Sequence, residues 1–227
     1  MLLPGLDGTG ELFRPLLAEL PSWIHPVVVS YPRERTLGYA ELLPLAAGLL
    51  PTADPFVILG ESFSGPLAVM LAAGRPAGLK GVILCATFVS KPFRALPAWL
   101  GVLCVGPIFR LWPTVLRLRS LPIRGELRGL LPLALAAIRS VRPAVVAARV
   151  RALLNVDVRT ELRAVEVPLL YLQAERDSLI RKHNAGEILS IRPDARLARI
   201  DTRHFLLQLE PRRAAAEIAS FLETLSG

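Results

Sequence analysis

The strongest chemical signal in the sequence is a serine that follows an apolar run. Residues 56–65 read Phe-Val-Ile-Leu-Gly-Glu-Ser-Phe-Ser-Gly, and a second apolar stretch continues to residue 73. A nucleophile on a sharp strand-to-helix turn has strained backbone geometry, and the residues two before and two after it must be small. Gly60 and Ser64 meet that condition around Ser62. The pattern predicts Ser62 as a nucleophile, and a serine-rich turn without chemistry is the alternative.

A serine nucleophile needs a base, and the chain has only three histidines. His25 precedes a proline at the entry to an early apolar run, and His183 lies on a charged stretch, so surface positions are expected for both. His204 follows a predicted strand. Ligands bind beyond the carboxyl ends of strands in open parallel sheets, so His204 is predicted as the base.

The base must be oriented by an acid, and three carboxylates follow the last two predicted strands. Asp177 lies deepest in the loop after residues 167–173 and has room to turn back toward a histidine. Glu175 and Asp201 are the alternatives. The chain order Ser62, Asp177, His204 is the one expected for a hydrolase with a nucleophile elbow.

The oxyanion of an acyl-transfer reaction needs backbone N–H donors. One donor is predicted at Phe63, directly after the nucleophile, and the other at Leu6, in the glycine-rich loop 3–10. A glycine-rich loop could instead hold phosphate. This loop has neither the Lys-Ser/Thr ending nor the G-x-G-x-x-G spacing of nucleotide sites, so that reading is weak.

Short apolar runs alternate with helix-like stretches and must position these side chains. Strands are expected at 26–30, 55–59, 81–85, 167–173 and 195–200, and helices at 11–20, 39–50, 65–73, 180–191 and 211–225. Alternation of this kind is typical of an α/β fold with a mostly parallel sheet flanked by helices. Residues 89–162 contain no convincing strand, and their prolines are expected to divide them into short helices.

With these motifs together, the chain resembles the serine esterases of the α/β-hydrolase superfamily. Within it, the chain is similar to small bacterial carboxylesterases of the pimeloyl-[acyl-carrier protein] methyl ester esterase type. The resemblance rests on residues 3–10, 60–65, 176–177 and 204–208. It implies an N-terminally trimmed α/β-hydrolase core at 1–88 and 163–227, with a helical lid inserted at 89–162. It also implies Ser62 as nucleophile, His204 as base and Asp177 as acid, with oxyanion donors at Leu6 and Phe63.

The expected activity is hydrolysis of short- to medium-chain acyl esters through an acyl-enzyme, with no metal or organic cofactor. A thioesterase or an acyltransferase is the alternative on the same residues. A non-catalytic ligand receptor on a hydrolase scaffold is the alternative from another class, and an intact set of catalytic residues argues against it.

The charge of the 227-residue chain is regional. The net charge is +8, yet residues 89–152 hold eleven basic residues and one acidic residue, a net charge of +10. The arginines are expected to form a solvated face, and an acyl carrier protein or anionic lipid is a possible partner. Few aromatic residues and no groove-reading motif argue against binding of nucleic acid.

We expect a cytoplasmic protein without a leader or transmembrane segment, in which Cys85 and Cys104 are buried, inert thiols.

Overall fold

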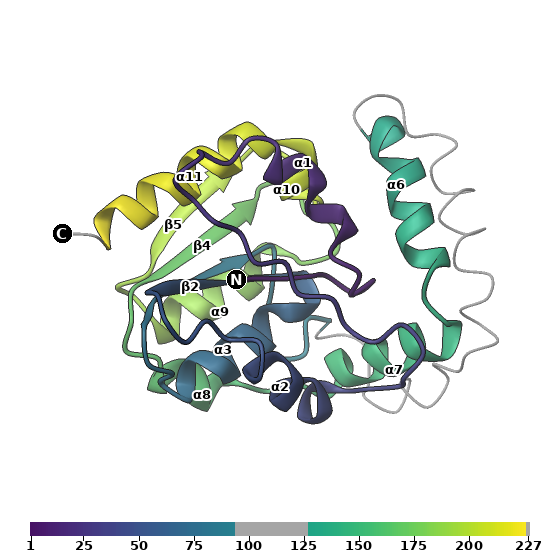
Figure 1. Cartoon of the computed structure of the whole chain (residues 1–227), viewed down its shortest axis with the longest axis horizontal. Helices are drawn as coiled ribbons and strands as arrows, with labels where there is room; N and C mark the ends of the chain where they lie inside the picture. Colours follow the sequence, from purple (N-terminus) through teal and green to yellow (C-terminus); the bar gives the residue numbers. More distant parts are fainter. Residues whose placement is uncertain (94–126, 226–227) are drawn as a thin grey trace.

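A single parallel sheet forms the centre of the molecule (Figure 1). The structure is a computed structural model that describes residues 1–93 and 127–225. The strands lie in chain order, β1-β2-β3-β4-β5, and each is parallel to its neighbours. Their bounds are β1 Leu2–Leu3, β2 Phe56–Glu61, β3 Leu79–Cys85, β4 Leu169–Ala174 and β5 Arg196–Ile200.

Helices cover both faces of the sheet, as expected for apolar strands that are buried on two sides. Those in the described residues are η1 (Glu11–Phe13), α1 (Arg14–Leu17), α2 (Tyr39–Ala47), η2 (Ser62–Ser64), α3 (Gly65–Ala73), α6 (Leu127–Arg139), α7 (Pro143–Leu154), α8 (Arg159–Ala164), α9 (Lys182–Ile191), α10 (Leu206–Leu209) and α11 (Pro211–Thr224). One apolar core packs α2, α3, α8 and α9 against the sheet, and the other packs α1, α10 and α11 (Figure 1). The predicted α/β fold with a parallel sheet and flanking helices is confirmed.

Two predicted elements are wrong in detail. Residues 26–30 form no regular strand. Their only strand partner among the described residues is the two-residue β1, through an isolated bridge between Leu2 and Val28. Residues 11–20 form a 3₁₀ turn followed by the four-residue α1. Beyond Leu17 the amides of Glu19 and Leu20 both donate to the carbonyl of Leu16, so the regular helical pattern ends there.

The segment between β3 and β4 is helical where it is described. Helices α6 and α7 lie outside the two layers beside the sheet (Figure 1), whereas α8 packs against α3 and α9. Pro132 lies inside α6 and does not end it, so the expected division at prolines is wrong at this position. Within the described ranges no single helix is long and apolar enough to cross a bilayer. The segments Gly129–Arg139 and Pro143–Leu154 pass that test only together, and they are bent by 100° at their break.

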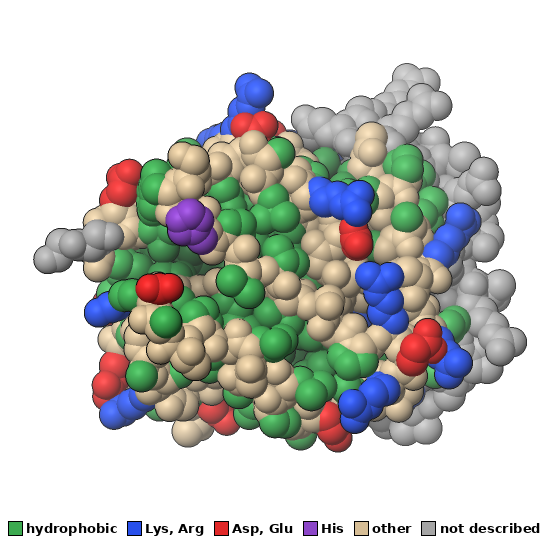
Figure 2. Space-filling model, in the orientation of Figure 1, with side chains coloured by type: hydrophobic (Ala, Val, Ile, Leu, Met, Phe, Trp, Pro, Cys, Tyr) green, Lys and Arg blue, Asp and Glu red, His purple; other side chains and the backbone are tan. Residues whose placement is uncertain are grey.

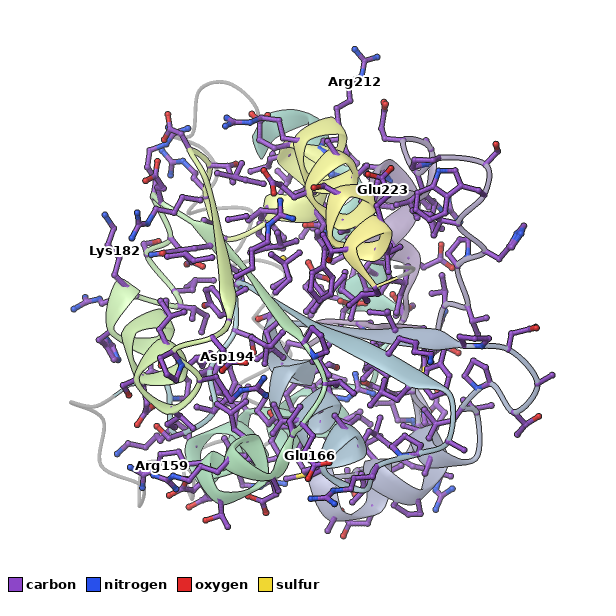
Figure 3. The ribbon with its side chains drawn as sticks, turned by 90° about the vertical axis from the view of Figure 1, so that its left-hand side faces the viewer. Arg159, Glu166, Lys182, Asp194, Arg212 and Glu223 are labelled. Atoms are coloured by element: carbon purple, nitrogen blue, oxygen red, sulfur yellow. The ribbon has the colours of Figure 1, made fainter. Side chains whose placement is uncertain are left out.

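Many charged side chains lie at the surface of the molecule, among them Arg159, Lys182 and Arg212 (Figure 3). Several form ion pairs at the surface, such as Arg159 with Asp157 at 2.6 Å and Arg212 with Glu19 at 3.1 Å. Exposed pairs of this kind contribute little to stability, because water screens both charges. The apolar cores on the two faces of the sheet therefore hold the fold together.

Two glycines provide a matched test of how tightly the sheet and α3 are packed. A Cβ at Gly65 would overlap the side chain of Thr87, whereas a Cβ at Gly186 on α9 would meet nothing within 4 Å. We expect Gly65→Ala to lower the free energy of unfolding by about 1–3 kcal/mol through overpacking. Gly186→Ala should raise it by about 0.5–1 kcal/mol through helix propensity. Urea denaturation of both variants measures the difference, and equal effects would contradict the packing at Gly65.

Candidate active site

Ser62 lies directly beyond the carboxyl end of β2, on a sharp turn into α3. Its φ is 49°, in the left-handed region that a residue with a side chain rarely adopts. A Cβ at Gly60 would lie 2.6 Å from the carbonyl oxygen of Ser64 and 2.8 Å from the Cβ of Ala68. Only glycine fits at that position, because the helix closes tightly over the strand. The turn therefore projects Ser62 away from the sheet, as the sequence pattern predicts.

Polar side chains from three other segments fix this turn. The hydroxyl of Thr87 donates to the carbonyl of Ser62 at 2.5 Å, and the buried hydroxyl of Tyr39 donates to the carbonyl of Phe63 at 2.7 Å. Ser64 donates to the carbonyl of Pro4 and lies 2.6 Å from the hydroxyl oxygen of Tyr31. Burial raises the pKa of the Tyr39 phenol well above its usual range, so this donor keeps its proton. The strained backbone of Ser62 is thus held from several sides.

The carboxyl ends of β4 and β5 bring a carboxylate and an imidazole to the same serine. His204 Nε2 lies 2.9 Å from Ser62 Oγ, and His204 Nδ1 lies 2.7 Å from Asp177 Oδ2. The side chain of Asp177 is only 4% exposed and that of His204 13%. The other oxygen of Asp177 accepts the amides of Leu179 and Ile180, each at 2.8 Å. These contacts fix the carboxylate, which in turn fixes the ring.

The alternative bases and acids lie elsewhere. His25 is exposed, and Asp201 forms an ion pair with Arg176 at 2.7 Å. His183 is half-buried, and its Nε2 has no hydrogen-bond partner among the described residues. Its expected solvated position is therefore wrong, although it lies outside the serine–histidine–aspartate set. Glu175 lines a separate pocket, described below.

The glycine-rich loop after β1 lies against the nucleophile, because β1 and β2 are neighbours with Leu3 opposite Gly60. A Cβ at Gly5 would lie 4.0 Å from the Cβ of Ser62. A turn closes this loop through a hydrogen bond of 3.0 Å from the amide of Gly8 to the carbonyl of Gly5. Leu6, one of the two predicted oxyanion donors, is the second residue of that turn. The other, Phe63, follows Ser62 in η2.

A buried carboxyl group lies under the nucleophile and was not singled out by the sequence. Glu61 is 6% exposed, and its carboxylate accepts a hydrogen bond of 2.8 Å from Gln208 on α10, four residues after His204. Burial is the main cause that raises the pKa of Glu61 from 4.5 to about 7. The pair links the serine turn to the histidine loop. Its only sequence signal is an acidic residue at the end of an apolar strand.

The raised pKa of Glu61 predicts how the free energy of unfolding changes with pH. The folded protein binds this proton more tightly than the unfolded chain, so the stabilisation is present below pH 4.5 and is lost as the pH rises to about 7. Between pH 5 and pH 8 the unfolding free energy of the wild type should fall by about 2–3 kcal/mol more than that of Glu61→Gln. Chemical denaturation across this range measures it. Glu175→Gln, at an exposed position, should keep the wild-type dependence, and a Glu61→Gln curve parallel to the wild type would refute the assignment.

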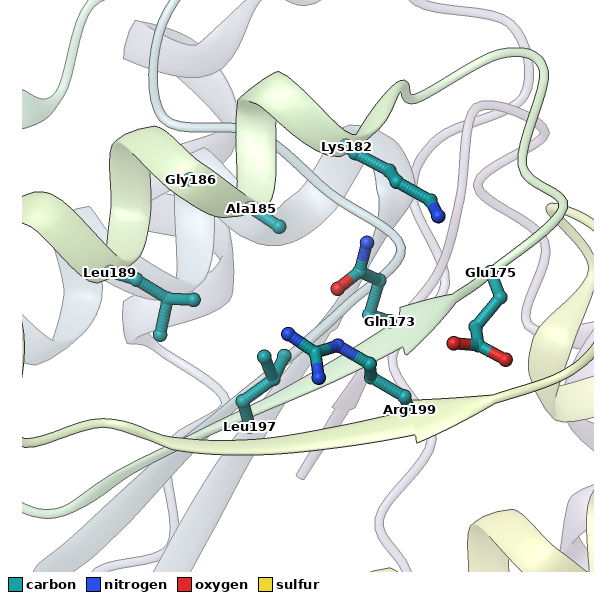
Figure 4. Close-up of a pocket in the computed structure, with 8 residues that line it drawn as sticks. All are labelled: Gln173, Glu175, Lys182, Ala185, Gly186, Leu189, Leu197 and Arg199. Atoms are coloured by element: carbon teal, nitrogen blue, oxygen red, sulfur yellow. The ribbon is translucent and has the colours of Figure 1, made fainter.

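Two cavities lie away from Ser62. One of about 330 Å³ lies between α9 and the ends of β4 and β5, with Gln173, Lys182 and Arg199 among its lining residues (Figure 4). The other, of about 660 Å³, is lined mostly by apolar residues from the amino ends of β1 to β3 and from α1 and α11. Apolar side chains surround a hollow on the face shown in Figure 2. The serine and histidine lie instead at the carboxyl ends of the strands, where ligands bind in parallel sheets.

The basic segment is only partly described. Its residues Arg94, Arg110, Arg117, Arg119 and Arg124 and the thiol of Cys104 lie outside the described residues. Cys85 is a free, buried thiol, as expected, and burial raises its pKa well above the usual range.

Arg149 on α7 is only 1% exposed, so the expectation that the arginines of this segment form a solvated face is wrong for this residue. Its carbonyl partners are more than a hundred residues away in the chain, so no local pattern could reveal its burial.

Comparison with known proteins gives one similar sequence and many similar folds. No protein-family profile matches the chain. A pimeloyl-[acyl-carrier protein] methyl ester esterase from Aromatoleum aromaticum is 31% identical over 170 residues, which cover 67% of this chain and 68% of that protein. An esterase from Thermogutta terrifontis has a TM-score of 0.84 at 19% identity, over 99% of this chain and 89% of that one. The enol-lactonase from Burkholderia xenovorans LB400 has a TM-score of 0.77 at 19% identity, over 98% and 90%.

Proposed function

The chain belongs to the esterases of the α/β-hydrolase superfamily, and we propose that it hydrolyses carboxylic esters through an acyl-enzyme on Ser62. The observation that carries the proposal is the continuous contact from Ser62 Oγ to His204 Nε2 and from His204 Nδ1 to Asp177 Oδ2, at 2.9 and 2.7 Å. In this arrangement a serine hydroxyl, a base and an orienting acid act as one unit.

In the first half of the reaction, Ser62 Oγ attacks the ester carbonyl carbon while His204 takes the hydroxyl proton. The carboxylate of Asp177 accepts the Nδ1–H bond and stabilises the imidazolium that forms. The carbonyl oxygen becomes an oxyanion, for which the amides of Leu6 and Phe63 are the proposed donors. Collapse of the tetrahedral intermediate breaks the bond to the alcohol, which leaves with the proton from His204.

In the second half, water attacks the acyl-enzyme carbonyl and His204 again takes the proton. The second tetrahedral intermediate releases the carboxylic acid and returns the proton to Ser62 Oγ. These steps need only this chain's own side chains and amides.

We propose residues 89–162 as a lid over a core of 1–88 and 163–227. The position of α6 and α7 outside the two helical layers supports this division, whereas α8, in which the proposed lid ends, packs against α3 and α9 in the core. The apolar residues of the lid then line the acyl pocket of a short- to medium-chain ester. A series of p-nitrophenyl esters from acetate to decanoate tests this preference, which we expect to peak between four and eight acyl carbons; a maximum at long chains would refute it.

Labelling with a fluorophosphonate tests the nucleophile. We expect one adduct per chain, at Ser62, that is lost in Ser62→Ala. The same atoms could cleave a thioester or pass the acyl group to an alcohol. Rates on matched ester and thioester substrates, with and without an alcohol acceptor, separate these reactions. A protein that takes up no label would instead be a receptor on a hydrolase scaffold.

We further propose that the basic lid is a docking surface for an acidic carrier protein. The net charge of +10 in residues 89–152 supports this, and the similar protein from Aromatoleum aromaticum carries the name of an esterase of an acyl-carrier-protein ester. Charge reversal of Arg117, Arg119 and Arg124 should weaken binding to acyl carrier protein at least tenfold. Unchanged binding would overturn the proposal, and binding only to anionic vesicles would assign the surface to lipid. A cytoplasmic location remains a prediction.

A further inference from the structure

Arg149 on α7 is a buried cation that is solvated almost entirely by backbone carbonyl groups. Its Nη1 donates to the carbonyls of Leu6 and Asp7 at 3.0 and 2.6 Å, and its Nη2 donates to that of Pro32 at 3.2 Å. No carboxylate in the described ranges lies within ion-pair distance of it, and its Nε has no hydrogen-bond partner there. Burial lowers the pKa of the guanidinium. A buried charge whose hydrogen-bond acceptors are all carbonyl oxygens is costly, and the attraction of the Asp7 carboxylate and the ring of Tyr31 offsets only part of that cost.

The loop after β1 closes around this guanidinium. A Cβ at Gly8 would lie 2.7 Å from the Arg149 Cζ, so only glycine leaves room for the cation. The φ of Gly8 is +67°, which also favours glycine. The guanidinium carbon lies 5.5 Å from the ring centroid of Tyr31, whose amide donates to the carbonyl of Gly8 at 2.7 Å. The loop, the cation and Tyr31 thus form one packed unit.

The two loop carbonyls that bind Arg149 belong to the central residues of the turn Gly5–Gly8. That turn is closed by the hydrogen bond from the Gly8 amide to the Gly5 carbonyl. The peptide between Gly5 and Leu6 is trans, so the Leu6 N–H points opposite to the Gly5 carbonyl. The direction of this N–H therefore depends on the conformation of the turn. Pro4 is held from one side by Ser64, and Leu6 and Asp7 are held from the other by Arg149.

Helix α7 also contacts the turn through apolar packing. The side chain of Leu6 packs against a small cluster that Val141, Val145, Val146 and Ala147 form at the start of α7. Arg149 lies on the same helix, one turn further on. The turn is therefore attached to α7 both by hydrogen bonds and by a hydrophobic contact. Its own closing hydrogen bond, the amide of Tyr31 and the hydroxyl of Ser64 hold the rest of the loop.

We infer that Arg149 is a positioning residue for the Leu6 amide, so that α7 must be seated on the loop for the oxyanion hole to have its working geometry. This inference rests on the proposed function. It makes the segment between β3 and β4 part of the catalytic apparatus, through a cation that does not itself touch the substrate. If this segment only shielded the substrate from water, changes in it would not alter how strongly the oxyanion of the transition state is stabilised.

The test compares Arg149→Met and Arg149→Lys with Leu153→Ala, a buried position on α7 that packs in the main apolar core and forms no hydrogen bond to the loop through its side chain. The readouts are kcat and KM for p-nitrophenyl butyrate, the melting temperature, and the affinity for an alkyl trifluoromethyl ketone. Ser62 Oγ adds to the ketone carbon, its proton passes to His204, and the ketone oxygen becomes an oxyanion. The affinity for this inhibitor therefore reports the oxyanion hole.

For Arg149→Met we expect kcat to fall about 10²- to 10³-fold, with KM within about threefold of the wild type. The ketone affinity should fall by a similar factor. Arg149→Lys keeps the charge but cannot reproduce the planar fork of Nη1 and Nη2 that spans the three carbonyls, so kcat and ketone affinity should fall together by at least tenfold. Leu153→Ala should melt at a lower temperature, and its kcat and ketone affinity should stay within about threefold of the wild type.

Three results would overturn the inference: loss of kcat with unchanged ketone affinity, an Arg149→Lys variant equal to the wild type, or equal losses in Leu153→Ala. If Arg149→Met does not fold, Arg149→Lys alone decides. Fluorophosphonate labelling of the wild type distinguishes failure of the proposed esterase activity from failure of the proposed role of Arg149. A wild type that takes no label refutes the proposed esterase, whereas a labelled wild type with fully active Arg149 variants refutes only the role of Arg149.

Discussion

Replacement of Ser62 by alanine is expected to lower kcat for p-nitrophenyl butyrate by about 10⁴- to 10⁶-fold. The hydroxyl oxygen of Ser62 is the atom that forms the bond to the acyl carbon, and no other hydroxyl lies at 2.9 Å from His204 Nε2 among the described contacts. KM should change little, because the acyl pocket and the oxyanion donors remain. The residual rate would come from those donors acting on water.

The fold should tolerate this change. Alanine adopts the left-handed φ of 49° about as poorly as serine, so the strain of the turn is the same in both proteins. The variant loses one hydrogen bond, worth about 1 kcal/mol. Circular dichroism and the melting temperature should therefore stay near the wild type, which separates loss of chemistry from loss of structure.

Ser190→Ala is the matched control. Ser190 is exposed on α9, and its hydroxyl donates to the Glu187 carbonyl within the same helix. Its activity should stay within about twofold of the wild type, since exposed substitutions have small effects. Turnover that persists in Ser62→Ala, once contaminating wild type has been excluded by the fluorophosphonate label, would remove Ser62 from the reaction and with it the proposed mechanism.

The parts of the molecule that could be predicted from sequence are those with a local cause. Apolar runs bounded by small residues identified β2, β3 and β4, because a strand buried on both faces is almost continuously apolar. The edge strand β5 contains two arginines and was identified from its place in the alternation of strands and helices. The turn at Ser62 was predictable because Gly60 and Ser64 are required by sterics within five residues. The short β1 and the bridge at Val28 were harder, since a two-residue strand leaves no periodic pattern.

The contacts that hold the site together could not be predicted, because they join segments far apart in the chain. Arg149 lies 143 residues from Leu6, and Gln208 lies 147 residues from Glu61. In a segment with many arginines, nothing in the local sequence distinguishes the buried Arg149 from its exposed neighbours. The choice of Asp177 over Glu175 and Asp201 rested on loop position and on the family resemblance. The structure brings Asp177 to His204, and the catalytic roles of both remain predictions.

Replacement of Asp177 by asparagine is expected to lower kcat by about 10⁴-fold while the fold is kept. The reason lies in how the carboxylate is held. Its Oδ1 accepts two backbone amides, from Leu179 and Ile180, and its Oδ2 faces His204 Nδ1. An asparagine has only one oxygen, and the two backbone donors require it at the Oδ1 position. The amide NH₂ group must then face the histidine.

With the NH₂ group of the asparagine facing His204, the imidazole must adopt its other neutral tautomer. With a donor opposite Nδ1, the neutral ring of His204 must place its proton on Nε2, and Nε2 then cannot accept the proton of Ser62. Stopped assays at pH 7 to 8, with the melting temperature as a check on folding, measure the loss. Asp201→Asn and Glu175→Gln are the matched controls, because both carboxylates were alternatives in the sequence and neither contacts His204 in the structure. Each should stay within about threefold of the wild type. A fully active Asp177→Asn, together with an inactive variant at Asp201 or Glu175, would transfer the role of the acid to that residue.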